Sequence, residues 1–298
     1  MKSYKFFKSS ILRSILLFIL LFSFQTSFSQ DIFSKERFFK QSTNRKGRMF
    51  LNWGYNRAEF TNSNIHFKGN NANGNYDFTI NNVVALDRQS TFDWDTYFNP
   101  AWFTVPQYDF TLGYYLNNKF ALSINMDHMK YVMIADQIAN ISGNINETAN
   151  PYNGIYNNTP MKLTEAFLTF EHTDGLNYGN IEGSFTQDIY TSKSGNFAIE
   201  TMMGVGMGIL IPKSNVKLFS YPRNDAWHFA GYGVSSRLGV NLVFYKNFFL
   251  QVNLKSGFIN MPNIVTRGTS VADRASQHFF FLQENVLVGV SLPLRKNK

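Results

Sequence analysis

Residues 234–258 read VSSRLGVNLVFYKNFFLQVNLKSGF. In this stretch apolar residues such as Leu238 and Val240 alternate with small or polar ones, both before and after the dipeptide Lys246-Asn247. A period of two places successive side chains on opposite faces of a β-strand. A two-residue connection between two such runs favours a β-hairpin. The stretch therefore predicts two antiparallel strands, each apolar on one face and polar on the other.

Segments with the same alternation recur along the chain, and their connections are alternately short and long. Transmembrane β-barrels have this arrangement, with short periplasmic turns and long extracellular loops. The short connections are 117–119, 192–196 and 246–247, and the long ones are about 60–106, 134–177, 212–231 and 263–278. We therefore expect an all-β fold, an antiparallel up-and-down transmembrane β-barrel with long extracellular loops. Its eight strands are expected at roughly 47–59, 107–116, 120–133, 178–190, 197–211, 232–245, 248–262 and 279–294.

Two strand-like stretches inside the long connections, 76–86 and 163–172, leave an alternative open. They could form hairpins that extend the barrel above the membrane. They could instead be two further spanning strands, which would make ten. We favour eight, because ten strands would require long periplasmic connections, against the usual pattern.

Composition and charge exclude several classes of protein. The formal net charge of +8 over 298 residues includes four basic residues in the first 13, so it is not the charge excess of a nucleic-acid-binding protein. Aromatic residues make up 17% of the chain and charged residues only 16%, which does not suit a disordered chain. There is no cysteine, which excludes disulfides, thiol catalysis and cysteine-ligated metals.

The N-terminus has the features of an export signal. Basic residues precede a short apolar run at 15–22, and Ser27-Phe28-Ser29 supplies small residues at a cleavage site. We expect a cleaved signal peptide at 1–29, a periplasmic segment at 30–45, and an outer-membrane barrel with extracellular loops and a short basic tail at 46–298. No later segment is long and apolar enough to be expected to span a bilayer as a helix.

Aromatic residues cluster near the expected strand ends, as in the interfacial girdles of membrane barrels. Tyr114, Tyr115, Tyr190 and Phe248 lie beside the three short turns. Glu284 is an exception to the pattern, because it falls on the expected lipid-facing side of the last strand. A β-bulge or a position near the membrane interface would relieve it.

An eight-stranded barrel encloses an interior that side chains can fill, so we do not expect a wide aqueous channel. Buried charges are costly unless they are paired. We therefore expect a network of salt bridges in the lumen rather than a path for protons or ions. The inward-facing charged residues are Asp109, Asp127, Glu182, Glu200, Arg237 and Lys255.

No catalytic, metal or cofactor site is expected. The one serious enzyme hypothesis is a lipid A-modifying barrel with Ser276, His278 and Glu284, but Glu284 is about 20 Å from His278 along one strand at ~3.3 Å per residue. The sequence His-Thr-Asp-Gly at 172–175 is better interpreted as a turn. The loop carboxylates match no calcium-binding motif.

An aromatic stretch at 92–103 is a candidate contact surface for a partner. Its alternative role is packing over the mouth of the barrel. The expected partners are outer-membrane lipid and lipopolysaccharide, together with an envelope protein, and nucleic acid is not expected. The candidate contact residues are Trp94, Tyr97, Phe98, Trp102 and Phe103.

The sequence also resembles a known class. The Ser-Phe-Ser-Gln end of the signal, the strands rich in Asn, Phe and Tyr, and the asparagine turns resemble Bacteroidota-type outer-membrane barrel proteins. The pieces 110–123 and 238–254 resemble small barrels such as outer-membrane proteins W and A. Other stretches, such as 125–133, are similar to an uncharacterised Bacteroidota group that carries no assigned activity. The W-type resemblance implies passage of small hydrophobic molecules, and the A-type resemblance implies a role in envelope integrity.

Residues and resemblance together favour a non-enzymatic outer-membrane barrel with a structural or interaction role through its extracellular loops. A conduit for small hydrophobic molecules across the outer membrane is the main alternative. A lipid A-modifying enzyme is the third.

Overall fold

The computed structural model of the protein describes residues 38–40, 44–99, 101–102, 105–219, 221–268 and 272–294. The expected signal peptide at 1–29 and the basic tail at 295–298 lie outside these residues and stay predictions. Among the described residues there is no helix long and apolar enough to cross a membrane.

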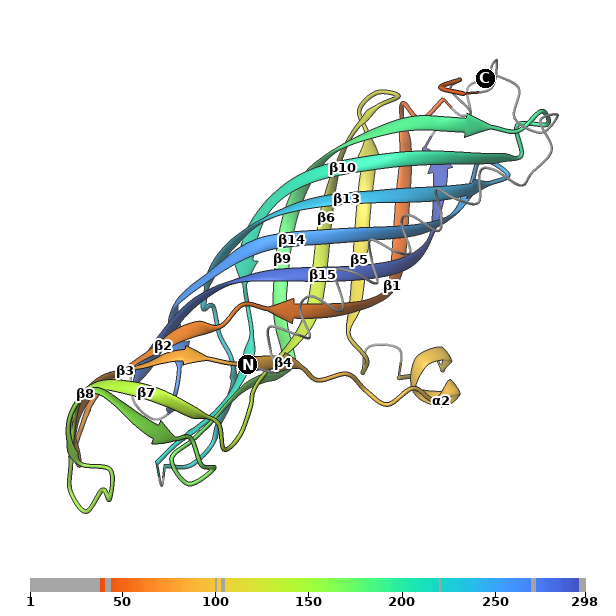
Figure 1. Ribbon diagram of the computed structural model, residues 1–298. Coiled ribbons are helices and arrows are strands. Elements are labelled where there is room, and N and C mark those ends of the chain that lie inside the picture. Colours follow the sequence, from red (N-terminus) through yellow and green to blue (C-terminus); the bar gives the residue numbers. More distant parts are fainter. Residues whose placement is uncertain are drawn as a thin grey trace.

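Eight antiparallel strands pair in sequence around a closed ring (Figure 1). The ring closes where the first strand pairs with the last, from Arg48 opposite Pro293 to Phe60 opposite Phe281. The expectation of eight strands rather than ten is confirmed. The strands are β1 (Arg48–Phe60), β5 (Tyr108–Tyr115), β6 (Phe120–Met133), β9 (Leu168–Thr191), β10 (Phe197–Leu210), β13 (Gly231–Phe244), β14 (Phe248–Val265) and β15 (Arg274–Pro293).

The long connections form a second layer of structure beyond one end of the ring, which we call the head (Figure 1). On one side of the head, β15 continues into β2, β3, β7 and β8, and on the other side β9 pairs with β11 and β6 pairs with β4. The stretches 76–86 and 163–172 therefore extend the fold and add no spanning strands. The added elements are β2 (Ser63–Asn71), β3 (Gly74–Val83), β4 (Ala85–Asp87), β7 (Ile138–Glu147), β8 (Gly154–Lys162), β11 (Lys213–Leu218) and β12 (Asn224–Trp227).

An apolar core holds the head together. Residues from both sides of the head form this core, together with residues from the parts of β6, β9, β14 and β15 nearest the head. Phe67 and Phe78 stack with ring centroids 5.2 Å apart, and Tyr131 stacks on Phe279 at 5.0 Å. Full burial of one such side chain stabilises a fold by about 1.5–3 kcal/mol. The loops thus form a packed β-structure in which β9, β14 and β15 extend further than the sequence predicts.

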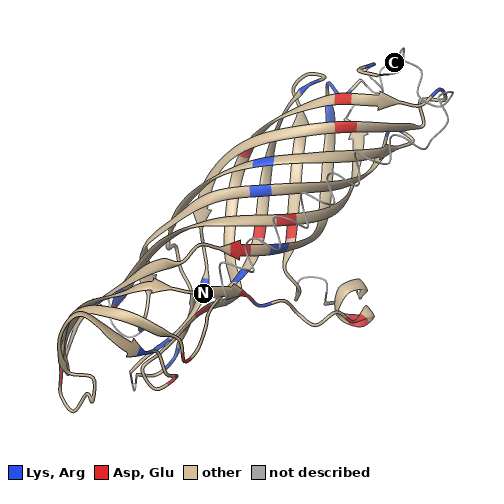
Figure 2. Ribbon diagram, viewed as in Figure 1, with Lys and Arg blue, Asp and Glu red and all other residues tan. Residues whose placement is uncertain are grey.

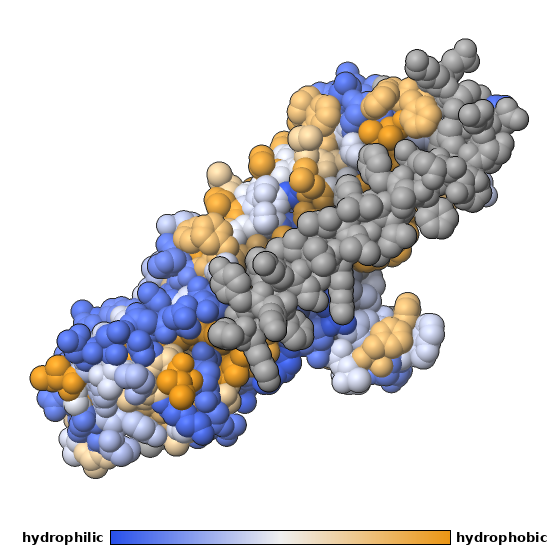
Figure 3. Space-filling view, viewed as in Figure 1, coloured by the Kyte–Doolittle hydropathy of each residue, from blue (hydrophilic) through white to orange (hydrophobic). Residues whose placement is uncertain are grey.

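The outer face of the ring is apolar. On β13 the outward residues run from Tyr232 through Leu238 to Phe244, and at ~3.3 Å per residue and a ~45° tilt this covers about 28 Å along the barrel axis. Figure 3 shows apolar residues on the barrel surface and a mainly hydrophilic head. This is the distribution of a transmembrane barrel. Glu284 does lie on the outer face, and its partner across the β1–β15 ladder is Arg57.

Two details differ from the predictions. Tyr114 and Phe248 face outward as girdle residues, but Tyr115 and Tyr190 are buried inside the ring. The reason for Tyr115 is that adjacent residues of a strand point to opposite faces, so Tyr114 and Tyr115 cannot both face outward.

The second difference is that residues 172–175 do not form a turn. They belong to β9, where they form a bulge opposite β6 with Gly175 at a φ of 122°, because the flanking residues pair with β6 on both sides.

Cysteine labelling tests this topology cleanly, because the chain has no cysteine of its own. Asn73 lies exposed in the β2–β3 turn of the head, and Lys193 lies exposed in the β9–β10 turn at the opposite end. In intact cells a membrane-impermeant maleimide should label Asn73→Cys and spare Lys193→Cys. Permeabilised cells, in which both should react, are the control. Labelling of Lys193→Cys in intact cells would invert the model.

Candidate functional site in the lumen and at the barrel wall

All six charged residues predicted to face the lumen are buried. Figure 2 shows positions of both charge signs along the strands of the barrel. Arg237 forms an ion pair with Glu182 through its Nη2 atom. A Cβ placed on Gly204 would lie only 2.5 Å from Oε1 of Glu182. Gly204 therefore makes room for the acidic member of this pair, and any larger residue there would displace it.

A second buried ion pair joins Lys255 to Asp127. The same Asp127 oxygen accepts a hydrogen bond from the amide of Asn180 at 3.0 Å, and the lysine Nζ lies 5.3 Å from the centre of the Tyr178 ring. Arg237 and Lys255 are direct neighbours across the β13–β14 ladder. Two like charges at this spacing repel each other, so each is stabilised by its own carboxylate on another strand.

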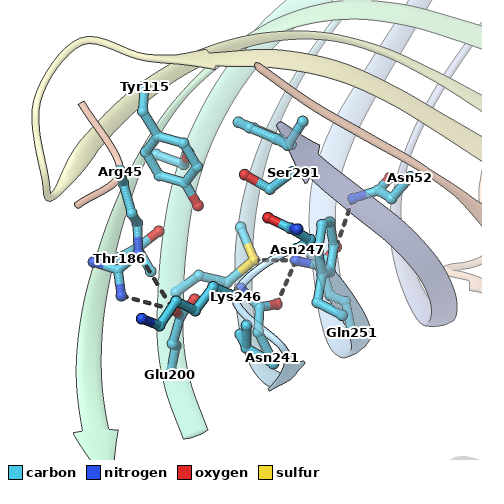
Figure 4. A pocket seen from close by; sticks show the side chains of 15 residues that line it. Arg45, Asn52, Tyr115, Thr186, Glu200, Asn241, Lys246, Asn247, Gln251 and Ser291 are labelled. Carbon is cyan, nitrogen blue, oxygen red and sulfur yellow. Dashed lines mark hydrogen bonds and ion pairs between the residues drawn. The ribbon is translucent and has the colours of Figure 1, made fainter. Parts of the chain in front are cut away.

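A third set of ion pairs was not anticipated from the sequence. Arg45, just before β1, places its Nη2 atom 2.6 Å from Asp188 and 2.7 Å from Glu200 inside the ring. Its Nη1 atom donates to the carbonyl of Asn118 in the neighbouring turn at 2.7 Å. Figure 4 shows the arginine side chain directed toward Glu200. The surplus of acids over bases among the six predicted lumen residues is the signal that another cation was required.

Asp109 is held differently, by neutral amides. Asn56 donates to its Oδ1 at 2.9 Å and Gln283 donates to the same atom at 3.1 Å. Its neighbour across the β5–β6 ladder is Asp127. Asp109 thus lies beside the carboxylate that is paired with Lys255, and its own hydrogen-bond partners are amides.

Amide side chains extend the set of contacts around Arg45 and Glu200 near the end opposite the head. Asn241 donates to Glu200 at 3.3 Å, Gln251 donates to Asn241 at 2.9 Å, and Asn52 donates to Gln251 at 3.2 Å (Figure 4). The cavity that remains there has a volume of about 30 Å³, which is room for a few waters at about 10–15 Å³ each. Side chains therefore fill most of this end of the lumen.

The barrel wall has a gap that side chains and loop backbone close. The pairing of β1 with β5 ends at Tyr55 opposite Tyr108, although β1 continues to Phe60. Beyond that point the backbone N–H of Asn56 donates to the carbonyl of Gln107 at 3.2 Å. The backbone N–H of Ala58 donates to Asp87 at 3.0 Å. Unpaired backbone groups facing lipid are costly, so these contacts replace the missing strand.

Burial raises the pKa of the Asp87 carboxyl to about 6, although hydrogen bonds from Ala58, Gln89 and Gln107 act in the opposite direction.

The predicted contact residues lie on an arm, residues 88–107, which joins β4 to β5 and carries the short helix α2 (Trp94–Phe98). Trp94, Phe98 and Trp102 are exposed, by 73%, 63% and 53%. Tyr97 is buried instead, and its hydroxyl donates to the carbonyl of Ser90 at 2.9 Å. It fixes the arm and is not available as a contact. Phe103 lies outside the described residues.

The residues considered for an enzyme are not assembled into a triad. Ser276 and His278 lie on the head part of β15, and Glu284 lies on the outer face of its barrel part. A Ser–His pair that the sequence did not predict joins Ser214 and His172 at 2.9 Å, but both are fully buried. Within the described part of the chain, no group of three or more His, Cys, Asp or Glu side chains could hold a metal ion.

Comparisons with known proteins give structural neighbours only. No family model matches the sequence, and no curated protein matches it significantly. The outer membrane protein OprG from Pseudomonas aeruginosa is 7% identical over 85% of this chain and 99% of its own, with a TM-score of 0.37. AlkL, solved in lipid bilayers, is 11% identical over 87% and 96%, with a TM-score of 0.37. Ail, the attachment invasion locus protein of Yersinia pestis, is 8% identical over 81% and 99%, at 0.26. With TM-scores this low, the fold assignment rests on the strand pairing described above.

Arg45 and Lys46 form a matched pair for testing the lumen network, because they are adjacent and only the first is buried. Arg45→Ala leaves Asp188 and Glu200 buried without their cation and should lower the free energy of unfolding by about 3–5 kcal/mol. Lys46→Ala removes the same charge from an exposed turn and should change it by less than about 0.5 kcal/mol. Denaturant unfolding in lipid vesicles measures both. Equal effects would show that Arg45 is hydrated.

Proposed function

We propose that this protein is a non-conducting outer-membrane β-barrel that anchors the head in the membrane and presents it at the cell surface in a structural or interaction role. The apolar outer face of the ring supports the membrane location. The expected signal peptide at 1–29 agrees with export.

The observation that carries the proposal is the filled interior. A solute crossing the lumen would have to separate the Arg237–Glu182, Lys255–Asp127 and Arg45–Glu200 pairs. Removing one partner of a buried pair typically costs about 3–5 kcal/mol. The aromatic core of the head closes the same path at its other end. These features disfavour a conduit through the lumen, and the scattered positions of Ser276, His278 and Glu284 disfavour the lipid A-modifying enzyme.

The head supplies a surface suited to a protein partner. Among the described residues β8 pairs with β7 alone, so its other edge is free. Ile155 on this strand is 91% exposed. A free strand edge presents unpaired backbone donors and acceptors to which another chain can add a strand. We place the contact of an envelope protein partner at this edge.

Conductance measurements test the closed lumen. Purified protein reconstituted into planar bilayers should give no stepwise conductance, because the interior contains no continuous water path. The double variant Glu182→Ala with Arg237→Ala removes one complete pair and serves as a variant with a wider lumen. A steady conductance of the unmodified protein would contradict the proposal and favour the conduit.

Purification from native membranes in mild detergent tests the role of the head. A stoichiometric partner should accompany the unmodified protein and be lost with Ile155→Lys, because a charge on the strand edge opposes pairing. Ile138→Lys alters an exposed isoleucine at the start of β7, away from the free edge of β8, and should retain the partner. Both changes should leave the free energy of unfolding within about 0.5 kcal/mol. A partner that survives Ile155→Lys would exclude β8 as its contact.

A further inference from the structure

The arm lies beside the barrel wall and is separate from the head (Figure 1). It is fixed there by Tyr97, whose ring packs against Tyr55 of β1 with centroids 4.9 Å apart. The hydroxyl of Tyr55 also donates to the carbonyl of Tyr97. Tyr55 packs in turn on Trp53 at 4.7 Å. Since Trp53 and Tyr55 are outward-facing residues of β1, the arm is attached to the apolar outer face of the ring.

The exposed aromatic residues of the arm form one surface. Trp94 and Phe98 are four residues apart on α2, a spacing that places them on the same side of a helix. Their ring centroids are 4.9 Å apart, and the ring of Phe92 lies 5.9 Å from that of Trp94. Trp102 adds a further exposed indole. A cluster of large exposed aromatic side chains normally marks a contact surface.

The polar groups of α2 are satisfied within the arm itself. Asp93 caps the helix by accepting from the backbone N–H of Thr96 at 2.7 Å, and Asp95 accepts from the side chain of Asn99 at 2.8 Å. At 100° per residue, Thr96 lies on the side of the helix opposite Trp94 and Phe98, whereas Asp95 lies on the flank. The aromatic side of this short helix needs an apolar or interfacial neighbour.

We propose that the arm is an interfacial anchor whose aromatic residues Trp94, Phe98 and Trp102 insert into the outer leaflet beside the barrel. The occupant of this surface is membrane lipid at the boundary between headgroups and acyl chains. Continuity with Tyr55 and Trp53 argues for lipid over a protein, because the arm is attached at the outer face that already contacts lipid. Tryptophan is also the residue most typical of that depth. The inference rests on the membrane location in the proposed function.

Fluorescence quenching by brominated phospholipids tests the anchor. The chain has four tryptophans, Trp53, Trp94, Trp102 and Trp227, and phenylalanine at three of them leaves a single emitter. Vesicles carry bromine either near the headgroup end or near the methyl end of the acyl chain, and iodide is the aqueous quencher. Heat-modifiable migration on gels confirms that each single-tryptophan variant is folded.

The fluorescence of Trp94 should be quenched most strongly by lipids that carry bromine near the headgroups. It should be quenched little by iodide in the aqueous phase. Trp53 on the barrel wall is the positive control for contact with lipid. Trp227, which is 57% exposed on β12 of the head, is the aqueous control and should respond only to iodide.

Two results would overturn the anchor in different ways. If Trp53 is quenched by lipid while Trp94 responds only to iodide, the membrane barrel stands and the arm is a water-exposed surface, available to a protein. If neither Trp53 nor Trp94 is quenched by lipid, the membrane location fails and the anchor fails with it.

Discussion

The structure depends on one constraint, that polar groups removed from water must be satisfied inside the protein. The pairing of β1 with β15 closes the ring and removes every free edge from its walls, except where β5 begins late. There Asp87 and the carbonyl of Gln107 bond the backbone of β1 in place of a strand. Once the ring is closed, its outward side chains must be apolar, and its polar residues can only face inward.

The same constraint determines the arrangement of the lumen. Eight strands leave too little space to hydrate several charges, so each charge needs a partner of opposite sign or a set of amide dipoles. Arg237, Lys255 and Arg45 each have an acidic partner on another strand, whereas Asp109 relies on Asn56 and Gln283. Three of these contacts, Arg237–Glu182, Lys255–Asp127 and Gln283–Asp109, join strands that are not adjacent in the sheet. The charges therefore contribute to holding the ring in one shape, and the core of the head continues this packing above it.

Alternation along the strands was sufficient to predict the eight-stranded ring and the inward direction of six charged residues, because a period of two is a local property of the sequence. Features set by non-local contacts were not predictable in this way. Arg45 lies before the first strand, where no alternation assigns it to the lumen, and the imbalance of charge among the six lumen residues is the only sequence signal of a further cation. The bulge at 172–175 has the composition of a turn, and pairing of its flanks with β6 overrides that signal. Tyr97 was grouped with its exposed neighbours because its contact with Tyr55 joins residues 42 positions apart.

The central claim is that the lumen is a dry, paired network. A double-mutant cycle on Glu182 and Arg237 tests it most directly, because both side chains are almost fully buried and they pair over Gly204 of β10, the strand between them. Unfolding free energies of Glu182→Ala, Arg237→Ala and the double variant, measured in lipid vesicles, give the coupling energy of the pair. The account predicts a favourable coupling of about 2 kcal/mol or more, with the double variant more stable than the sum of the single changes implies. A coupling close to zero would mean that water separates the two charges, and it would contradict the closed lumen.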